Sequence, residues 1–173
     1  MFITADQHFY HKRILKYRPF ATVEEMNREM IERWNEIVGK DDVVYVLGDF
    51  SLGRAEETIE VAHSLNGSKT LILGNHDRKR TRTFWKRAGF EDVVEKLVIH
   101  FMVLSHEPVE ELPEGFFNFH GHEHEYNECK THMCVSADLT DFRPYQLMPH
   151  DFLSLKAIHD RAKGEGKLIS DMI

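Results

Sequence analysis

The sequence has few cysteines, no long apolar run and an excess of acidic over basic residues. Only two of its 173 residues are Cys, and so few do not build the disulfide framework of a small secreted scaffold. A membrane-spanning helix needs about 18 consecutive apolar residues, which occur nowhere in the sequence. Asp6 also lies too near the N-terminus to leave room for the apolar region of a signal peptide. We therefore expect a cytoplasmic protein without membrane contact.

The charge balance disfavours one class of partner, extended nucleic acid. The chain has 22 Lys and Arg residues against 29 Asp and Glu, a formal net charge of -7 at pH 7. Proteins that follow a nucleic-acid backbone rely on many Lys and Arg contacts, so a broad surface of that kind is not expected. The hydrophobic fraction of 42% is typical of a globular protein. Because there is no internal repeat or low-complexity linker, we expect one domain over residues 1–173, with 164–173 as a loosely held tail.

The first half of the chain alternates short apolar runs with amphipathic segments. Apolar runs at 1–5, 43–47 and 70–73 predict three buried strands. Apolar residues at helical spacing predict helices over 22–38 and 55–65, the first opened by a capping-box pair and closed by a glycine. This alternation is typical of parallel βα units, whose functional groups gather at the carboxyl ends of the strands.

The second half is richer in β-type segments. A helix is predicted over 83–88 and a last helix over 151–163. Between them, four segments have strand character: 92–94, 97–104, 116–119 and 133–137. We take the connections between these segments to be short turns, and short turns predict antiparallel pairing.

Polar clusters with metal-binding side chains follow five of the apolar runs. They are Asp6-x-His8, Gly48-Asp49, Gly74-Asn75-His76-Asp77, Ser105-His106 and Gly121-His122-Glu123-His124. Their carboxylate, imidazole and amide donors, without thiolate, suit first-row divalent ions better than a closed structural zinc site. A carboxylate such as Asp49 can bridge two ions, and a metal pair about 3.5–4 Å apart clamps an in-line displacement at phosphorus. The pattern therefore predicts a dinuclear site for phosphoryl chemistry.

The order of these motifs resembles that of the calcineurin-like metallophosphoesterase superfamily. Its Asp-x-His, Gly-Asp, Gly-Asn-His-Asp/Glu, lone His and Gly-His-x-His motifs all occur here, in that order, within residues 6–124. Segments 8–27 and 135–144 are similar to a subgroup of small bacterial, archaeal and phage members. The resemblance implies an α/β sandwich of two mixed β-sheets flanked by helices. It also implies two divalent metal ions as cofactors, for which we expect Mn²⁺ and keep Fe, Zn²⁺ and Ni²⁺ as alternatives.

The resemblance also implies a role for each motif residue. One metal is expected on Asp6, His8 and His124, and the second on Asn75, His106 and His122, with Asp49 shared by both. A metal-bridging hydroxide would be the nucleophile, and His76 would protonate the leaving oxygen. In protein Ser/Thr phosphatases an Asp after the Gly-Asp motif orients this His, but residues 50–54 contain none. The partner of His76 is therefore unassigned, Asp77 is a second catalytic candidate, and protein phosphatase activity is not expected.

The implied activity is hydrolysis of small organic phosphates or nucleotides, with phosphodiesters preferred over phosphomonoesters. Two alternatives are a nuclease acting on DNA or RNA and a non-catalytic metal-binding scaffold of the same fold. His11, Arg18 and Arg54 are candidates for binding the substrate phosphate, although a surface or salt-bridge role would explain each of them equally.

Other residues near the motifs have an ordinary explanation beside a functional one. Four aromatic residues could stack on a nucleobase or belong to the core: Phe9, Tyr10, Phe50 and Tyr126. The trio Cys129, His132 and Cys134 lacks the Cys-x-x-Cys pair of structural zinc sites. The sequence makes no prediction of oligomeric state.

Overall fold

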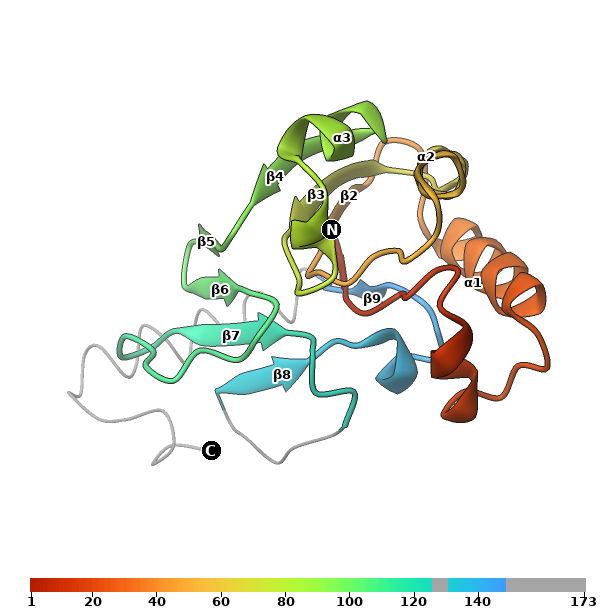
Figure 1. Ribbon diagram of the computed structural model, residues 1–173. Coiled ribbons are helices and arrows are strands. Elements are labelled where there is room, and N and C mark those ends of the chain that lie inside the picture. Colours follow the sequence, from red (N-terminus) through yellow and green to blue (C-terminus); the bar gives the residue numbers. More distant parts are fainter. Residues whose placement is uncertain (126–130, 149–173) are drawn as a thin grey trace.

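The protein is a sandwich of two mixed β-sheets in a computed structural model that describes residues 1–125 and 131–148 (Figure 1). The first sheet has the strand order β4-β3-β2-β1-β9, and the second has the order β5-β6-β7-β8. The strands of the first sheet are β1 (Phe2–Thr4), β2 (Val43–Val46), β3 (Ser68–Ile72), β4 (Phe90–Val94) and β9 (Tyr145–Gln146). Those of the second are β5 (Leu97–Ile99), β6 (Met102–Leu104), β7 (Phe117–His120) and β8 (His132–Cys134). The predicted α/β sandwich is confirmed.

Three α-helices accompany the first sheet. They are α1 (Val23–Ile37), α2 (Ala55–Ser64) and α3 (Arg82–Arg87), and short 3-10 turns occur at Lys12–Lys16, Asp77–Lys79 and Ala137–Leu139. Helix α1 begins where the sequence predicts, because the Thr22 side chain accepts the N–H of Glu25 at 3.1 Å. The Glu25 carboxylate in turn accepts the N–H of Ala21, one residue before the position of a standard capping box.

Alternation along the strands of the first sheet separates two hydrophobic cores. Phe2 and Val44 belong to the core that contains the helices. Ile3 and Leu47 belong to the core that contains Met102 and other residues of the second sheet. Because successive side chains point to opposite faces of a strand, the first sheet is buried on both sides. The helices therefore lie on the face opposite the second sheet (Figure 1).

The second sheet corrects the expected pairing. The predicted strand 97–104 is a hairpin of β5 and β6 that turns at His100, which has a left-handed φ of 54°. Strand β4 joins the first sheet, parallel to β3, and β6, β7 and β8 pair in parallel. The antiparallel prediction is wrong for these pairs because segments 105–116 and 121–131 are long connections, and parallel pairing needs such crossovers.

The end of the described chain departs from the prediction in two further ways. Strand β8 stops at Cys134, and the chain then crosses to the first sheet, where the N–H of Ala5 donates to the carbonyl of Val135. Strand β9, which the sequence did not suggest, pairs antiparallel with β1. The predicted helix 151–163 and the tail 164–173 lie outside the described residues. None of the helices in the described segments has both the length and the apolar character needed to cross a membrane.

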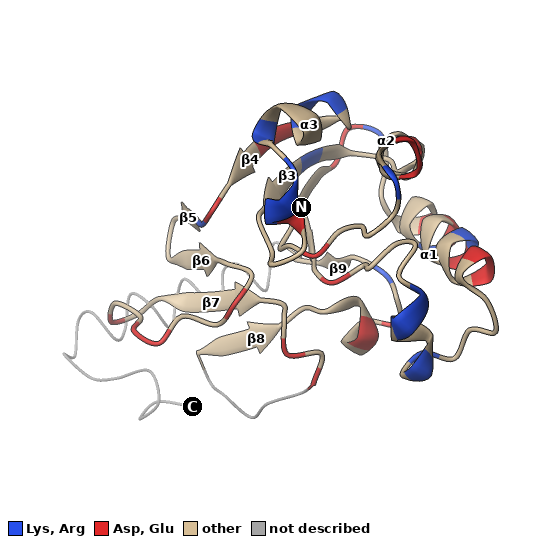
Figure 2. Ribbon diagram, in the orientation of Figure 1, with Lys and Arg blue, Asp and Glu red and all other residues tan. Residues whose placement is uncertain are grey.

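Charged side chains are distributed unevenly over this frame (Figure 2). The loops that flank β7 carry mainly Asp and Glu, whereas the segment around α3 carries several Lys and Arg. Segments 105–116 and 121–125 begin at the carboxyl ends of β6 and β7, and segment 73–81 runs from the carboxyl end of β3 to α3.

Candidate metal centre

Loops at the carboxyl ends of β1, β2, β3, β6 and β7 bring five of the seven predicted ligands together with His76. Among the described residues, three overlapping groups of side chains could hold a metal ion, and within each group the ligand atoms lie within 4.8 Å of one another. The groups are Asp6, His8 and His124; His8, Asp49 and His76; and Asp6, Asp49 and His106. Asn75 and His122 belong to none of these groups. Five segments far apart in the sequence therefore meet at one edge of the sandwich.

The first half of the centre surrounds His8. Its Nε2 lies 3.2 Å from the Nε2 of His124 and 3.9 Å from Oδ2 of Asp49. The Nε2 of His124 is in turn 3.8 Å from Oδ1 of Asp6. Burial, with further contributions from His124 and Arg18, lowers the pKa of His8 to about 2. A neutral imidazole is the form that binds a metal ion.

The second half lies on the other side of Asp49. The Nε2 of His106 is 3.7 Å from Oδ1 of Asp49, and the rings of His106 and His122 are 5.2 Å apart. The side-chain amide nitrogen of Asn75 lies 3.3 Å from Nδ1 of His122. Asn75 and His122 are both exposed, so this half of the centre opens to solvent.

Two buried polar atoms in the centre test whether a cation fits. The Nδ1–H of His106 donates to the carbonyl of Leu47 at 2.8 Å, because a carbonyl can only accept, and this leaves Nε2 as an acceptor. The Nε2 of His106 and Oδ1 of Asp6 are both buried without a hydrogen-bond partner in the described structure. An unsatisfied buried polar atom costs about 1–3 kcal/mol, so the donor set fits a bound metal ion.

Burial disfavours the charged form of two carboxyl groups at the centre, those of Asp6 and Asp77. Burial raises the pKa of Asp6 to about 7, against the opposing influence of His124. Burial likewise raises the pKa of Asp77 to about 6, although three backbone N–H groups oppose it. A divalent cation beside Asp6 would favour its charged form. Binding of a metal ion at this position would therefore be coupled to loss of a proton.

The ligands occupy an unusual backbone conformation. Left-handed φ values between 51° and 71° occur at five of them: Asp6, His8, Asp49, His122 and His124. Residues other than glycine seldom adopt this region, and such strain concentrates at functional sites. Four of the five, Asp6, His8, Asp49 and His124, belong to the groups of side chains that could hold a metal ion.

Glycines in the motifs make room for ligands that come from other motifs. A Cβ atom at Gly121 would lie 2.6 Å from Oδ2 of Asp6. A Cβ atom at Gly74 would collide with Oδ1 of Asp49. The glycine of each motif is thus required by the ligand of its neighbour, which explains why the residues occur as Gly-Asn and Gly-His pairs.

Asp77 joins two of the loops. Its Oδ2 accepts the N–H groups of Asp49 at 2.7 Å and Gly74 at 2.9 Å, and its Oδ1 accepts the N–H of Phe50 at 3.1 Å. With both oxygens engaged by the backbone, Asp77 has a supporting position, which does not favour its assignment as a catalytic group or as the orienting partner of His76.

His76 itself lies at the edge of both halves. Its Nε2 is 3.7 Å from Oδ2 of Asp49, and its ring packs 5.6 Å from that of His8 and 6.0 Å from that of His11. The backbone N–H of His76 donates to Oδ1 of Asp49 at 2.9 Å. Its Nδ1 is buried and has no hydrogen-bond partner in residues 1–125 and 131–148. Contacts with the rings of His8 and His11 and the backbone hydrogen bond to Asp49 hold His76 in place. The sequence leaves the partner of His76 unassigned.

Arg18 and Asp138 support the first half from behind. The guanidinium of Arg18 forms a bidentate pair with Asp138 at 2.8 Å and also donates to the carbonyls of Asp6 and Gln7. Asp138 accepts from Nδ1 of His124 at 2.7 Å, which leaves Nε2 of His124 to face Asp6. Although burial opposes it, these hydrogen bonds hold the pKa of Asp138 below its usual range. The Arg18 side chain has no exposed surface, so its guanidinium faces Asp138 and two backbone carbonyls, in line with the salt-bridge alternative.

The remaining candidates divide between the centre and the surface. His11 lies beside His8, with ring centroids 5.3 Å apart. Arg54 is exposed at the start of α2, where it pairs with Glu57 at 3.0 Å, and no described contact joins it to the ligands. Phe9 and Phe50 are fully buried in the core beside the helices, so the packing alternative holds for them. Tyr126 and Cys129 lie outside the described residues.

The sequence does not indicate that Asp138 links Arg18 to His124. Segment 135–144 is similar to the subgroup, but the similarity assigns no role to Asp138. Its bonds to Arg18 span 120 positions, so no local spacing signals them.

Fold and site together define an α/β sandwich protein with clusters of His and Asp that could hold metal ions. No protein-family model matches the chain. The uncharacterized protein MJ1445 of Methanocaldococcus jannaschii is 34% identical over 161 residues, which cover 85% of this chain and 86% of that protein. The chain therefore belongs to the family of this archaeal protein.

Phage proteins and one solved structure are also similar. The gene 66 protein of Mycobacterium phage D29 is 28% identical over 156 residues, covering 72% of this chain and 78% of that protein. That of Mycobacterium phage L5 is 42% identical over 78 residues, covering 43% of this chain and 38% of that protein. The crystal structure of AQ665, a protein of unknown function from Aquifex aeolicus, matches with a TM-score of 0.65 at 20% identity over 84% of this chain and 94% of that chain. It shares the fold.

Proposed function

We propose that the protein is a dinuclear metal-dependent phosphoesterase that hydrolyses small phosphodiesters. The observation that carries the proposal is the position of Asp49 between two sets of ligands, with its carboxylate 3.9 Å from Nε2 of His8 on one side and 3.7 Å from that of His106 on the other. One carboxylate that faces two groups of imidazoles is the arrangement expected of a ligand shared by two ions.

The ligand chemistry supports two ions. Asp6, His8 and His124 would hold the first and Asn75, His106 and His122 the second, with Asp49 common to both. Bound divalent ions would neutralise phosphate charge and lower the pKa of a water molecule. Mn²⁺ is the ion we expect, and the nitrogen and oxygen donors also suit Fe, Zn²⁺ and Ni²⁺.

His76 is the proposed general acid. Its side chain is 33% exposed, so a substrate can reach it, while its Nδ1 is turned into the protein. A proton on Nε2 could pass to the leaving oxygen of an ester, work for which an imidazole is suited near neutral pH. His11, beside His8 and His76, would contact a phosphate oxygen.

The preference for diesters follows from the surrounding cations. A monoester dianion calls for additional positive groups, and guanidinium forks commonly supply them. The Arg18 guanidinium is committed to Asp138 and two carbonyls, and Arg54 pairs with Glu57 at the surface. Neither predicted arginine is available to a monoester.

The test is hydrolysis of diphenyl phosphate by Mn²⁺-loaded protein, because its phenoxide leaving group is basic enough near neutral pH to need a proton. We expect His76→Ala to lower kcat roughly 100-fold or more, because a general acid contributes at least that much. His63→Ala, on the exposed side of α2, is the matched control and should retain full activity. If the protein hydrolyses no diester with Mn²⁺, Fe, Zn²⁺ or Ni²⁺, the proposal is refuted. Equal rates for wild type and His76→Ala would refute it as well.

A further inference from the structure

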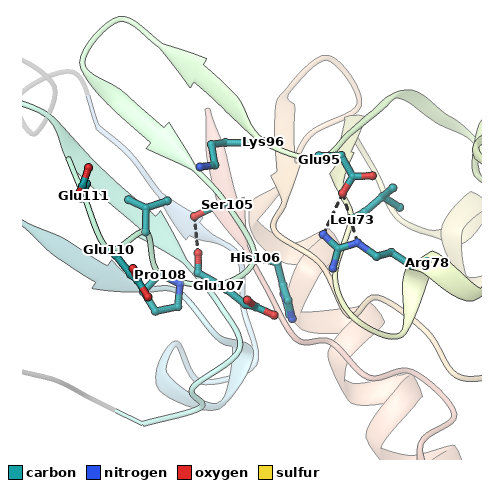
Figure 3. A pocket seen from close by; sticks show the side chains of 11 residues that line it. Leu73, Arg78, Glu95, Lys96, Ser105, His106, Glu107, Pro108, Glu110 and Glu111 are labelled. Atoms are coloured by element: carbon teal, nitrogen blue, oxygen red, sulfur yellow. Dashed lines mark hydrogen bonds and ion pairs between the residues drawn. The ribbon is translucent and has the colours of Figure 1, made fainter. Parts of the chain in front are cut away.

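A cavity of about 490 Å³ adjoins the open half of the metal centre. His106 belongs both to the centre and to the wall of this cavity. In Figure 3 the cavity lies between segment 105–111 on one side and Leu73, Arg78 and Glu95 on the other, with Lys96 at its border. Its size is in the range of small-molecule sites, so it can receive one substituent of a phosphate ester bound at the centre.

The charges of the cavity wall are mainly negative. Arg78 and Glu95 pair with each other at 2.9 Å and offer no net charge to a ligand. Three further glutamates, Glu107, Glu110 and Glu111, face a single lysine, Lys96. Two cations against four anions give the wall a net charge of −2. A second phosphate or a carboxylate in the cavity would therefore be repelled.

The residue types of the wall disfavour a second class of substituent, nucleobases and quaternary ammonium groups. Its apolar members are Leu73, Pro108 and Val109, and no Phe, Tyr or Trp side chain occurs among the described residues that line it. A nucleobase or a quaternary ammonium group usually binds against aromatic rings. A primary ammonium group needs no ring, because it has three N–H donors that match separate carboxylate oxygens.

We propose that this cavity binds a primary ammonium group carried by one substituent of the phosphodiester substrate. The inference rests on the proposed function, since it assigns a substrate class to the same centre. The phosphate would lie over Asp49 and His106, and the aminoalkyl arm would extend along segment 105–111 toward Glu110 and Glu111. The acidic wall then selects the arm, while the metal ligands select the phosphate.

Three matched substrates test the assignment. p-Nitrophenyl diesters whose second arm is 4-aminobutyl, 4-hydroxybutyl or 4-carboxybutyl are similar in length and differ in the charge of the group at the end of that arm, which is too far from phosphorus for ready attack on it. With Mn²⁺-loaded protein we expect kcat/KM to fall in that order, with an advantage of about fivefold for the amine over the hydroxyl, because an ion pair with exposed carboxylates is worth up to about 1 kcal/mol.

Variants tie the preference to the cavity. The double change Glu110→Gln and Glu111→Gln should bring the ratio of amine to hydroxyl kcat/KM close to one. Glu114→Gln removes an exposed glutamate from the same loop but outside the cavity wall, and it should keep the wild-type ratio. Equal kcat/KM for all three substrates, or a ratio that survives the double change, would overturn the inference and leave the proposed function standing. Hydrolysis of none of the three would overturn both.

Discussion

The two halves of the candidate metal centre are built in opposite ways. The half around His8 is enclosed, and behind it the buried Arg18 guanidinium holds Asp138, which in turn holds His124. The half around His106 depends on one backbone carbonyl, that of Leu47, and on exposed Asn75 and His122. Buried hydrogen-bonded networks fix geometry, whereas exposed ligands can exchange and admit substrate. We infer that the enclosed half provides metal affinity and the open half provides access.

Asp49 is the element common to both halves, so its replacement should have the largest effect. We expect Asp49→Asn to abolish hydrolysis of the aryl diester and to reduce bound Mn²⁺ to one ion per chain or less, because the shared charge is lost. Metal content after dialysis, measured by plasma mass spectrometry, checks this. Asp41→Asn, at an exposed position, should bind metal as the wild type does. Two ions retained by Asp49→Asn would contradict the shared-ligand assignment.

Loss of the support behind the enclosed half should reduce stability most. Arg18→Gln leaves the Asp138 carboxylate without its guanidinium and two backbone carbonyls without donors. Breaking a buried pair on one side costs about 3–5 kcal/mol, so we expect a fall of that size in the free energy of unfolding, measured by urea denaturation. The matched change Arg54→Gln affects only an exposed pair and should leave the midpoint where it is. A fall equal to that of Arg54→Gln would mean that the network carries no stability.

Metal itself should stabilise the fold. At a free Mn²⁺ concentration 100 times the dissociation constant, a single site that exists only in the folded state adds about 2.7 kcal/mol. Chelation should therefore lower Tm, and readdition of Mn²⁺ should restore it. A Tm that does not respond to chelator would show that the centre is not occupied in the folded protein.

A smaller and more selective effect is expected from Asp138→Asn. Removing a carboxylate that orients a metal-bound His weakens metal affinity about 10–100-fold. In a calorimetric titration, one of two Mn²⁺ binding steps should weaken by this factor, while the other stays as in the wild type. Asp141→Asn, an exposed neighbour in sequence, serves as control. Equal weakening of both steps would remove the distinction between the two halves.

The sequence predicted which residues gather at one edge of the sandwich better than it predicted the framework that positions them. Asp6, Asp49 and Asn75 follow three apolar runs, and parallel strands place such residues at one edge. The parallel pairing of β6, β7 and β8 is not predictable from the sequence, because no local feature distinguishes their connections from short turns and register between distant segments leaves no local signal. The buried pair of Arg18 and Asp138 is not predictable for the same reason, because the two residues are 120 positions apart in the sequence. Residue type suggested that Arg18 meets phosphate, but only the fold shows that its guanidinium is committed elsewhere.

His76 illustrates a second limit. The motif Gly74-Asn75-His76-Asp77 alone indicates that His76 is a candidate catalytic residue. The sequence leaves the partner that orients His76 unassigned, and the neighbouring Asp77 carboxylate accepts three backbone N–H groups. Which atoms a buried carboxylate meets depends on loop geometry, and spacing along the chain does not encode it.

The central claim, a pair of metal ions that share Asp49, is tested most directly by anomalous diffraction from crystals grown with Mn²⁺. The account predicts two anomalous peaks about 3.5–4 Å apart, one beside His8 and His124 and the other beside His106 and His122, with the Asp49 carboxylate between them. A single peak, or peaks that do not contact Asp49, would contradict it.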